Sequence, residues 1–555
     1  MEHHVVRQLA VYLQNIRKLF NPTSVLLAGL SILALSKSSK ILQSRKLQKT
    51  LSESHIDETA FPDEAEIRRI LERIGIAGPR TTGSEAHNDL IDWLEQELRK
   101  LPGLELRSDK YDILRWQTHP GTSLGDTGRL VVSAKEGDEE ITISGAVPFS
   151  KVVSSPDAPL VYLPGRKPIT EENAKGKIIL RDFPMHSMPY PLIFLLCHSK
   201  TSDFKKDMFG SYKRPGFADL ALKDDLLEAG RAGAAGMIIM FHVGREEVES
   251  YFEPHQGMHY RIPAVYVGVD EATRLKEYAS QGCSATVSVD GEVAPATTRN
   301  LLAVLPGQSE ERVIFESHTD GNTYVQENGP VALLALAQYF TKQPLSLRTR
   351  TIEFAFNSGH LHISKEGSHR HAQQLDREFD REKLTLVIPV EHLGTREIEE
   401  RVRLDGKPGS TLEYTGRGEM MIWCVGPSPP VVSAVQQAVN RRKLDRVIVA
   451  PGISKPDRSR VPTYSSFGGI GTYYHNALLP TTSLISGPWS LWAPRFGSSA
   501  VDVSRLRAQT LAIGDVYLAL ESTSRKDIIG GYAGYRRRRE TGANVTTSFT
   551  PEEMA

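Results

Sequence analysis

The stretch "VIFESHTDG" at residues 313–321 reads as the end of a buried strand that breaks into a polar turn. Its apolar residues run directly into His318 and Asp320, which stand one residue apart. An apolar helical pattern follows at 330–342, and a second strand pattern follows at 350–359. Alternating strands and helices of this kind predict a mostly parallel sheet whose functional residues lie at the carboxyl ends of its strands.

The same alternation extends in both directions along the chain. A helix is predicted at 367–379 and a strand at 384–394. Upstream, two amphipathic helices are predicted on either side of the Gly-Pro turn at 78–79, and short strand-like runs fill residues 104–165. The fold class predicted is α/β, with a mixed, mostly parallel central sheet flanked by helices.

Residues 135–294 have a pattern of their own, in which buried strands alternate with helices around Gly-Ala turns, and this pattern predicts an inserted α/β domain. No internal repeat is visible. The predicted organisation is an N-terminal apolar, targeting or anchor segment, the first part of the main domain, the insert, the second part of the main domain and a disordered tail: 1–55, 56–134, 135–294, 295–525 and 526–555.

Composition excludes several classes of function. The chain has 67 basic and 67 acidic side chains, so no global charge recruits nucleic acid or an acidic surface. Its three cysteines, Cys197, Cys283 and Cys424, have no CxxC spacing, which argues against a disulfide framework and against a cysteine-based zinc site. A metal would therefore have to be bound by His, Asp and Glu.

Residues 19–36 are uncharged and strongly apolar, but Pro22 interrupts them and the apolar core is short for a membrane-spanning helix. One interpretation is a membrane anchor or an interfacial segment. The other is a soluble docking helix or a relic targeting sequence. Localisation is accordingly left open between membrane-associated, cytoplasmic and secretory.

Three strand ends carry residues able to bind a metal. His318 ends the first strand, His360 follows the second, and Glu391 with His392 follows the third. Because parallel strands end at one edge of a sheet, these side chains are expected to meet, and imidazole with carboxylate suits Zn²⁺. Asp320 is the candidate partner for the second ring nitrogen of His318.

Other polar residues near these strands are interpreted more simply. His362, His369 and His371 alternate along a polar stretch and are predicted to lie on the surface. The "RRRR" run at 536–539 is predicted to be a solvated charge run. Glu327, just before a helix, either favours that helix N-terminus or belongs to the site.

Taken together, these residues resemble the zinc aminopeptidase family with co-catalytic metals, metallopeptidase family twenty-eight, in its form with an inserted protease-associated domain. The resemblance covers about residues 60–525. It rests on "GPRTTGSEAHNDLIDWLEQEL" and "TRNLLAVLPG" in the main domain, and on "GKIILRD", "GAAGMIIM" and "IPAVYV" in the insert. It implies a zinc-exopeptidase-like fold around a bound zinc ion.

The resemblance also implies a ligand set. His318 corresponds to the first metal ligand with Asp320 as its partner, Glu327 to the carboxylate that bridges two metals, and Glu391 to the ligand on the next strand. Imidazole substitutes for carboxylate as a zinc ligand, so His360 is the candidate that keeps a weakened second site. One zinc ion is expected, with the second site left open.

Two departures from the family pattern imply a degenerate active site. Gly359 and His360 stand where the family has two consecutive glutamates, one of them the general base. The last histidine ligand is expected near Gly471, whereas His475 lies four residues further on. His392 and His475, with Glu316, are the alternatives for the missing base.

Three functions are consistent with this pattern. The first is a metallopeptidase-like, aminopeptidase-like hydrolase acting on a peptide or small-molecule amide through a bound divalent metal. The second is a cyclising or acyl-transferring enzyme acting on a small molecule or a modified peptide. The third is a non-catalytic pseudo-peptidase that binds a partner, with membrane contact through residues 19–36 under the anchor interpretation and no nucleic-acid partner.

Overall fold

The computed structural model covers most of the chain, and the segments that it describes are 51–117, 127–165, 167–255, 259–362, 366–381, 383–452 and 467–540. The apolar segment at 19–36 and the end of the predicted tail, 541–555, lie outside these residues. Within the described part of the chain, no helix has the length and apolar character that a membrane crossing requires.

The central sheet is mixed, and its middle strands are parallel. β14 (Ser309–His318) lies between β15 (Arg350–Asn357) and β16 (Leu384–Pro389) and runs parallel to both. On the outer side of β15, β13 (Glu292–Leu305) and β1 (Glu105–Gln117) add antiparallel strands. The predicted α/β class with a mixed central sheet flanked by helices is confirmed.

The sheet continues beyond β16. Backbone hydrogen bonds from Val387 to Pro480 and from Glu391 to Leu484 join β16 to the next strand, β21. A further group of strands then extends the sheet in the order β21-β19-β20-β8. Their bounds are β21 (Thr482–Ile485), β19 (Met421–Val425), β20 (Val447–Ala450) and β8 (Ser199–Lys200).

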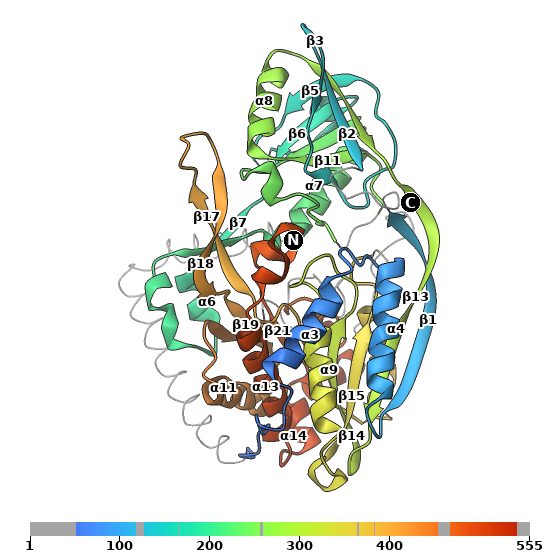
Figure 1. The fold of residues 1–555 in the computed structure, drawn as a ribbon, viewed down its shortest axis with the longest axis vertical. Coiled ribbons are helices and arrows are strands. Elements are labelled where there is room, and N and C mark those ends of the chain that lie inside the picture. The colour runs from blue at the N-terminus through green and yellow to red at the C-terminus, as the bar shows by residue number, and fades with distance from the viewer. Residues whose placement is uncertain are drawn as a thin grey trace.

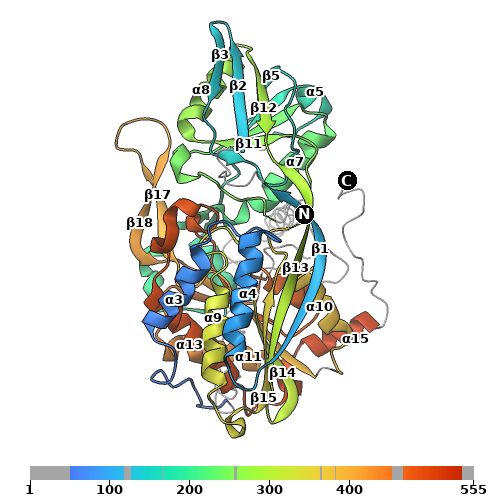
Figure 2. The same ribbon diagram turned by 45° about the vertical axis from the view of Figure 1, so that its right-hand side comes forward.

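Helices cover both faces of this sheet. Successive strand residues point to opposite faces, and both sets are apolar, so each face has to be buried. Phe315 packs in the larger core with α9 (Gly329–Phe340), while its neighbour Ile314 packs in a second core with residues of α10 (Ser368–Arg377). Figure 2 shows α3, α4 and α9 in front of the sheet. The remaining helices of the main body are α3 (Glu64–Gly75), α4 (Glu85–Arg99), α11 (Pro429–Arg441), α12 (Gly471–Asn476), α13 (Val503–Ala519), α14 (Arg525–Ile529) and α15 (Tyr532–Glu540).

The insert forms the upper part of the molecule in Figure 1, reached through the long β1–β13 pair. Its sheet has the order β3-β2-β12-β5-β6-β10-β11-β4, and since β2 belongs to it, the insert begins before the predicted boundary at residue 135. The strand bounds are β2 (Gly128–Ala134), β3 (Gly137–Ile141), β4 (Gly145–Ala146), β5 (Ala158–Tyr162), β6 (Ile178–Asp182), β10 (Gly236–Met240), β11 (Ala264–Val267) and β12 (Ser284–Val289). Its helices are α5 (Glu171–Ala174), α7 (Asp219–Arg231) and α8 (Val269–Ser280).

Two further strand pairs lie outside these sheets. The antiparallel pair of β7 (His186–Pro189) and β9 (Ser211–Arg214) encloses α6 (Tyr190–Leu196) and β8, and β8 pairs with β20 of the main body. The second pair consists of β17 (Arg396–Val402) and β18 (Ser410–Gly418). The insert sequence therefore also contributes to the central sheet.

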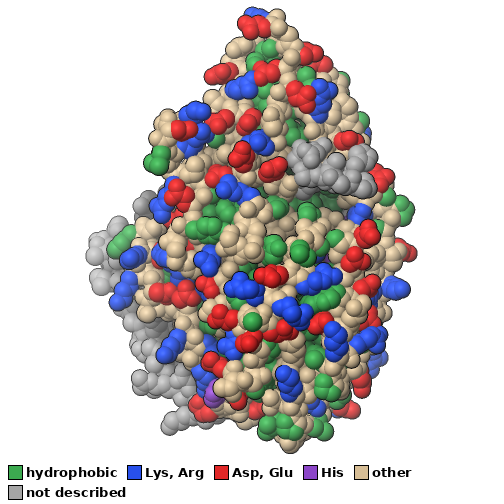
Figure 3. Space-filling model, in the orientation of Figure 1, with side chains coloured by type: hydrophobic (Ala, Val, Ile, Leu, Met, Phe, Trp, Pro, Cys, Tyr) green, Lys and Arg blue, Asp and Glu red, His purple; other side chains and the backbone are tan. Residues whose placement is uncertain are grey.

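The prediction of a disordered tail from residue 526 is wrong for residues 526–540, because α14 and α15 occupy most of this stretch. Arg536 and Arg539 both pair with Asp376 of α10 at 2.7 and 2.9 Å, and their side chains are mostly buried. The arginine run therefore packs partly against the body. Elsewhere acidic and basic side chains are interspersed, as Figure 3 shows for one face.

Candidate metal centre

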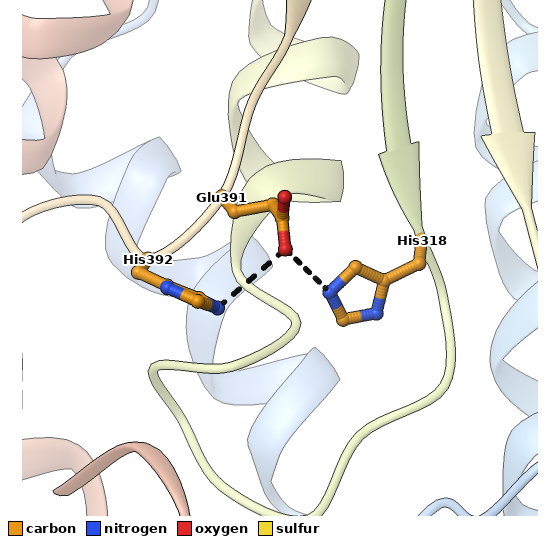
Figure 4. Close-up of side chains that lie close together, drawn as sticks. All are labelled: His318, Glu391 and His392. Atoms are coloured by element: carbon orange, nitrogen blue, oxygen red, sulfur yellow. Dashed lines mark ion pairs between the residues drawn. The ribbon is translucent and has the colours of Figure 1, made fainter. Parts of the chain in front are cut away.

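The parallel pairing of β14 with β16 brings three predicted residues together at one edge of the sheet. Glu316 pairs with Pro389, so His318 at the end of β14 lies beside the turn that carries Glu391 and His392. The Oε2 atom of Glu391 lies 3.5 Å from Nε2 of His318 and 3.7 Å from Nε2 of His392. Figure 4 shows the carboxylate of Glu391 between the two imidazoles.

These separations suit a metal better than hydrogen bonds. N–H···O hydrogen bonds span about 2.7–3.2 Å, whereas two atoms bound tetrahedrally to one Zn²⁺ lie about 3.3 Å apart. The Nε2 atoms of His318 and His392 and the Oε2 atom of Glu391 are buried, and they have no hydrogen-bond partner among the described residues. The donor set therefore fits a divalent cation.

Both imidazoles are held in the tautomer that a ligand requires. Nδ1 of His318 donates to the backbone oxygen of Asp320 at 2.7 Å, and Nδ1 of His392 donates to the backbone oxygen of Ser486 at 2.5 Å. Each Nε2 is thereby left to face Glu391. Such a bond to the second ring nitrogen orients a metal-binding histidine.

Burial and the glutamate act on the two imidazoles with different results. Burial lowers the pKa of His392 to about 4, more than Glu391 raises it, so this ring is neutral at pH 7. Burial also lowers the pKa of His318, but attraction to the neighbouring Glu391 carboxylate outweighs it, and the net pKa is raised. A cation at this centre would take the place of the proton that Glu391 favours on His318.

The glycine-rich segment 468–471 contacts the carboxylate of Glu391. The backbone N–H of Ile470 donates to Oε1 of Glu391 at 2.8 Å. Gly469 has a φ of +54°, and a Cβ atom at this position would lie 2.1 Å from the same oxygen. Backbone groups thus contact Glu391 close to the position where the family resemblance leads one to expect a histidine.

Glu327 is engaged elsewhere. Its Oε1 atom forms a fully buried ion pair with the guanidinium of Arg80, which also donates to the backbone oxygen of Thr323. Burial lowers the pKa of Arg80 to about 9, so the side chain remains cationic at pH 7. The predicted bridging carboxylate is thus paired with a cation, and it is not among the atoms that group His318, Glu391 and His392.

The remaining predicted residues take other positions. Asp320 contacts His318 through its backbone oxygen, while its carboxylate accepts hydrogen bonds from Thr82 and from the backbone of Leu361. The ring of His360 stacks on that of His318, with centroids 4.0 Å apart. His475 hydrogen-bonds Tyr532 at 2.7 Å, outside the cluster.

The prediction that His362 and His371 lie on the surface is wrong, because both side chains are buried. His362 reaches the backbone oxygen of Leu114, and His371 pairs with Glu353 on β15. The polar neighbours of His371 in the sequence gave no sign of the α10 face that packs against the sheet, and the burial of His362 depends on its contact with the distant Leu114.

A second cluster was missed by the sequence interpretation. Asp219, Glu253 and His255, all in the insert, place one ligand atom each within 4.8 Å of one another. The His255 ring lies between Trp492 and His360, with centroid distances of 4.3 and 5.0 Å. No local pattern signals this cluster, since Asp219 is 36 residues from His255 and the main-body contacts come from far along the chain.

Asn328 fixes the turn that carries the candidate ligands. Its side-chain amide donates to the backbone oxygen of Leu393 at 2.7 Å and accepts from the backbone N–H of Leu393 at 2.8 Å.

We expect Asn328→Ala to lower the free energy of unfolding by about 1–3 kcal/mol, because two buried backbone groups lose their partners. Chemical denaturation would measure this. Asn88→Ala, which removes a single exposed bond to Thr297, is the control and should change stability little. Equal losses in the two variants would contradict the assigned role.

With this geometry established, the fold can be compared with known proteins. No protein-family model and no curated protein sequence matches the chain. Solved structures do match, and the fold is that of zinc aminopeptidases and of a peptidase M28 family member.

The zinc aminopeptidase BSAP from Bacillus subtilis has 16% sequence identity and a TM-score of 0.55, over 81% of this chain and 93% of that chain. A peptidase M28 precursor from Shewanella amazonensis SB2B has 15% identity and a TM-score of 0.55, over 88% and 97%. An aminopeptidase from Aneurinibacillus sp. strain AM-1 has 15% identity and a TM-score of 0.51, over 82% and 94%. At these identities the similarity shows the fold alone.

Proposed function

We propose that this chain is a metallopeptidase-like hydrolase that binds one divalent metal ion, of the Zn²⁺ type, through His318, Glu391 and His392. The observation that carries the proposal is the set of three buried ligand atoms, spaced as ligands of one ion and without hydrogen-bond partners among the described residues. The proposed substrate is a peptide or another amide, as in the aminopeptidases that share the fold.

The chain's own residues would prepare this centre in three ways. Asp320 and Ser486 hold the two imidazoles through backbone oxygens, and Ile470 holds the carboxylate of Glu391. Burial removes competing water and strengthens electrostatic interactions within the centre. A zinc ion held by these three side chains would supply Lewis-acid chemistry, polarising a substrate carbonyl and lowering the pKa of a water molecule to about 7.

Metal content tests the proposal. We expect the full chain, purified without a metal-binding tag and supplied with Zn²⁺, to hold the ion at this centre. The double variant His318→Ala/Glu391→Ala should lose about one equivalent, measured by elemental mass spectrometry. His475→Ala is the matched control, because it removes a buried histidine outside the cluster, and it should keep the wild-type content. Unchanged metal in the double variant would overturn the proposal.

A second candidate function is a non-catalytic, partner-binding protein of the same fold. The buried pair of Arg80 with Glu327 favours it, because a guanidinium neutralises the carboxylate that the family resemblance assigns to bridging two metals. Glu391 and the two histidines would then bind metal without turnover. Assays of the zinc-loaded chain against aminoacyl amides and esters separate the candidates, since hydrolysis lost in His318→Ala/Glu391→Ala supports the enzyme.

A further inference from the structure

The insert carries a second group of metal-binding side chains, at the end that faces the candidate metal centre. Asp219 is the first residue of α7, while Glu253 and His255 lie in the segment before β11. Each of the three side chains is at least nine-tenths buried. One oxygen or nitrogen atom from each lies within 4.8 Å of the others, and Oδ1 of Asp219 is 3.1 Å from Nδ1 of His255.

One carboxylate oxygen in this group is uncommitted. Glu253 receives a hydrogen bond from the hydroxyl of Tyr251 on Oε2 at 2.6 Å, and the Tyr266 hydroxyl donates to its backbone oxygen. Its Oε1 atom is buried and has no hydrogen-bond partner among the described residues. A buried carboxylate oxygen without a donor is costly unless a proton or a cation satisfies it.

The other two side chains are held in place. Asp219 accepts the backbone N–H of His255 at 3.0 Å, and the His255 ring stacks on Trp492 with the ring of His360 tilted beside it. Burial raises the pKa of Asp219, but attraction to His255 and its hydrogen bond outweigh this, and the net pKa is lowered. Burial, reinforced by repulsion from Asp219, raises the pKa of Glu253 well above its usual value. A cation among these groups would relieve that repulsion.

We propose that Asp219, Glu253 and His255 form a second site for a divalent transition-metal cation, separate from the centre at His318. Two carboxylates and one imidazole are the donor set that suits Zn²⁺ or Mn²⁺. Oδ1 of Asp219 and Nδ1 of His255 lie 3.1 Å apart, a separation at which they hydrogen-bond without metal, and a cation would take the place of that shared proton. The site goes beyond the proposed hydrolase function, because every ligand belongs to the insert and none belongs to the first centre.

The two sites are connected through neighbouring imidazoles. The His255 ring lies tilted beside that of His360, and His360 stacks on His318 of the first centre. A cation bound to His255 would fix that ring and, through it, the position of His360. The insert would thereby gain a metal-dependent contact with the main body beside the first centre.

The test uses the full chain, with Zn²⁺ alone and Mn²⁺ alone as the probes. We expect two zinc equivalents in the wild type, one in Asp219→Asn/Glu253→Gln, one in His318→Ala/Glu391→Ala and none when all four changes are combined. The amide replacements keep side-chain size, and circular dichroism with thermal unfolding checks that each variant is folded. Glu253→Gln alone is the milder variant and should lower zinc affinity at the second site at least about tenfold.

The matched control is Glu247→Gln, which changes another buried carboxylate of the insert, one whose oxygens accept backbone N–H bonds from Gly244 and Leu412. It should keep both equivalents. The inference is overturned if the Asp219/Glu253 variant keeps the wild-type content of both metals, or if all bound metal is lost with the His318/Glu391 variant. If metal is lost in the Asp219/Glu253 variant but not in the His318/Glu391 variant, the second site is supported and the proposed hydrolase centre is overturned.

Discussion

Replacement of Gly469 by alanine is expected to weaken zinc binding at the first centre about 10–100-fold, the range for disturbing groups that position metal ligands. The new Cβ atom would lie 2.1 Å from Oε1 of Glu391, far inside van der Waals contact. The carboxylate would have to turn, and it would then lose the backbone hydrogen bond from Ile470. Competition against a fluorescent zinc chelator measures the affinity directly.

The control for this variant separates steric contact from backbone strain. Gly406 also has a positive φ, +72°, but a Cβ atom there would meet nothing within 4 Å. Gly406→Ala should therefore show the cost of an alanine in the left-handed region, about 1–2 kcal/mol of stability, with unchanged zinc affinity. If Gly469→Ala bound zinc as tightly as Gly406→Ala, the segment would not be what positions Glu391.

Arg80→Met is expected to lower the free energy of unfolding by about 3–5 kcal/mol, the largest stability effect that we expect from a single substitution. The variant leaves the carboxylate of Glu327 buried without its cation, and the cost of an unpaired buried charge exceeds the value of the bond itself. It also removes the donor to the backbone oxygen of Thr323. Urea denaturation of the metal-free chain measures the loss.

Two further variants test the cause of this loss. Arg80→Met combined with Glu327→Gln should regain a large part of the stability, because the remaining side chain is neutral. Arg129→Met removes an arginine from an exposed pair with Glu140 and should cost less than about 1 kcal/mol. No recovery in the double variant would show that Arg80 acts by packing and not by neutralising Glu327.

The sequence predicted the fold well because the decisive signals are local. Strand ends such as the one at His318 follow from runs of apolar residues, and parallel strands that share an edge bring their ends together. His318 and Glu391 could therefore be expected to meet, and the structure brings them to 3.5 Å. The change from apolar strand residues to polar turn residues marks the strand end at His318 within a few residues of sequence.

Other features of the candidate site depend on contacts between distant segments, which no local pattern reveals. The pairing of Glu327 with Arg80 joins the segment before α9 to the segment between α3 and α4. In sequence, His392 cannot be told from an ordinary turn histidine. Its ring faces Glu391 because Nδ1 donates to the backbone oxygen of Ser486, which is distant in the chain. His255 comes from the insert and reaches the main body only through tertiary packing.

The long antiparallel pair of β1 and β13 connects the main body to the insert. The pair runs in register from Glu105 opposite Val304 to Gln117 opposite Glu292, so the chain leaves for the insert and returns from it at adjacent points. In topological terms the insert occupies the position of a hairpin loop. A two-residue turn between Gln117 and Glu292 would close the same hairpin. Such an architecture would allow the insert to be exchanged at one point while the register of β1 with β13 is kept, and only β8, which pairs with β20, would leave the central sheet with it.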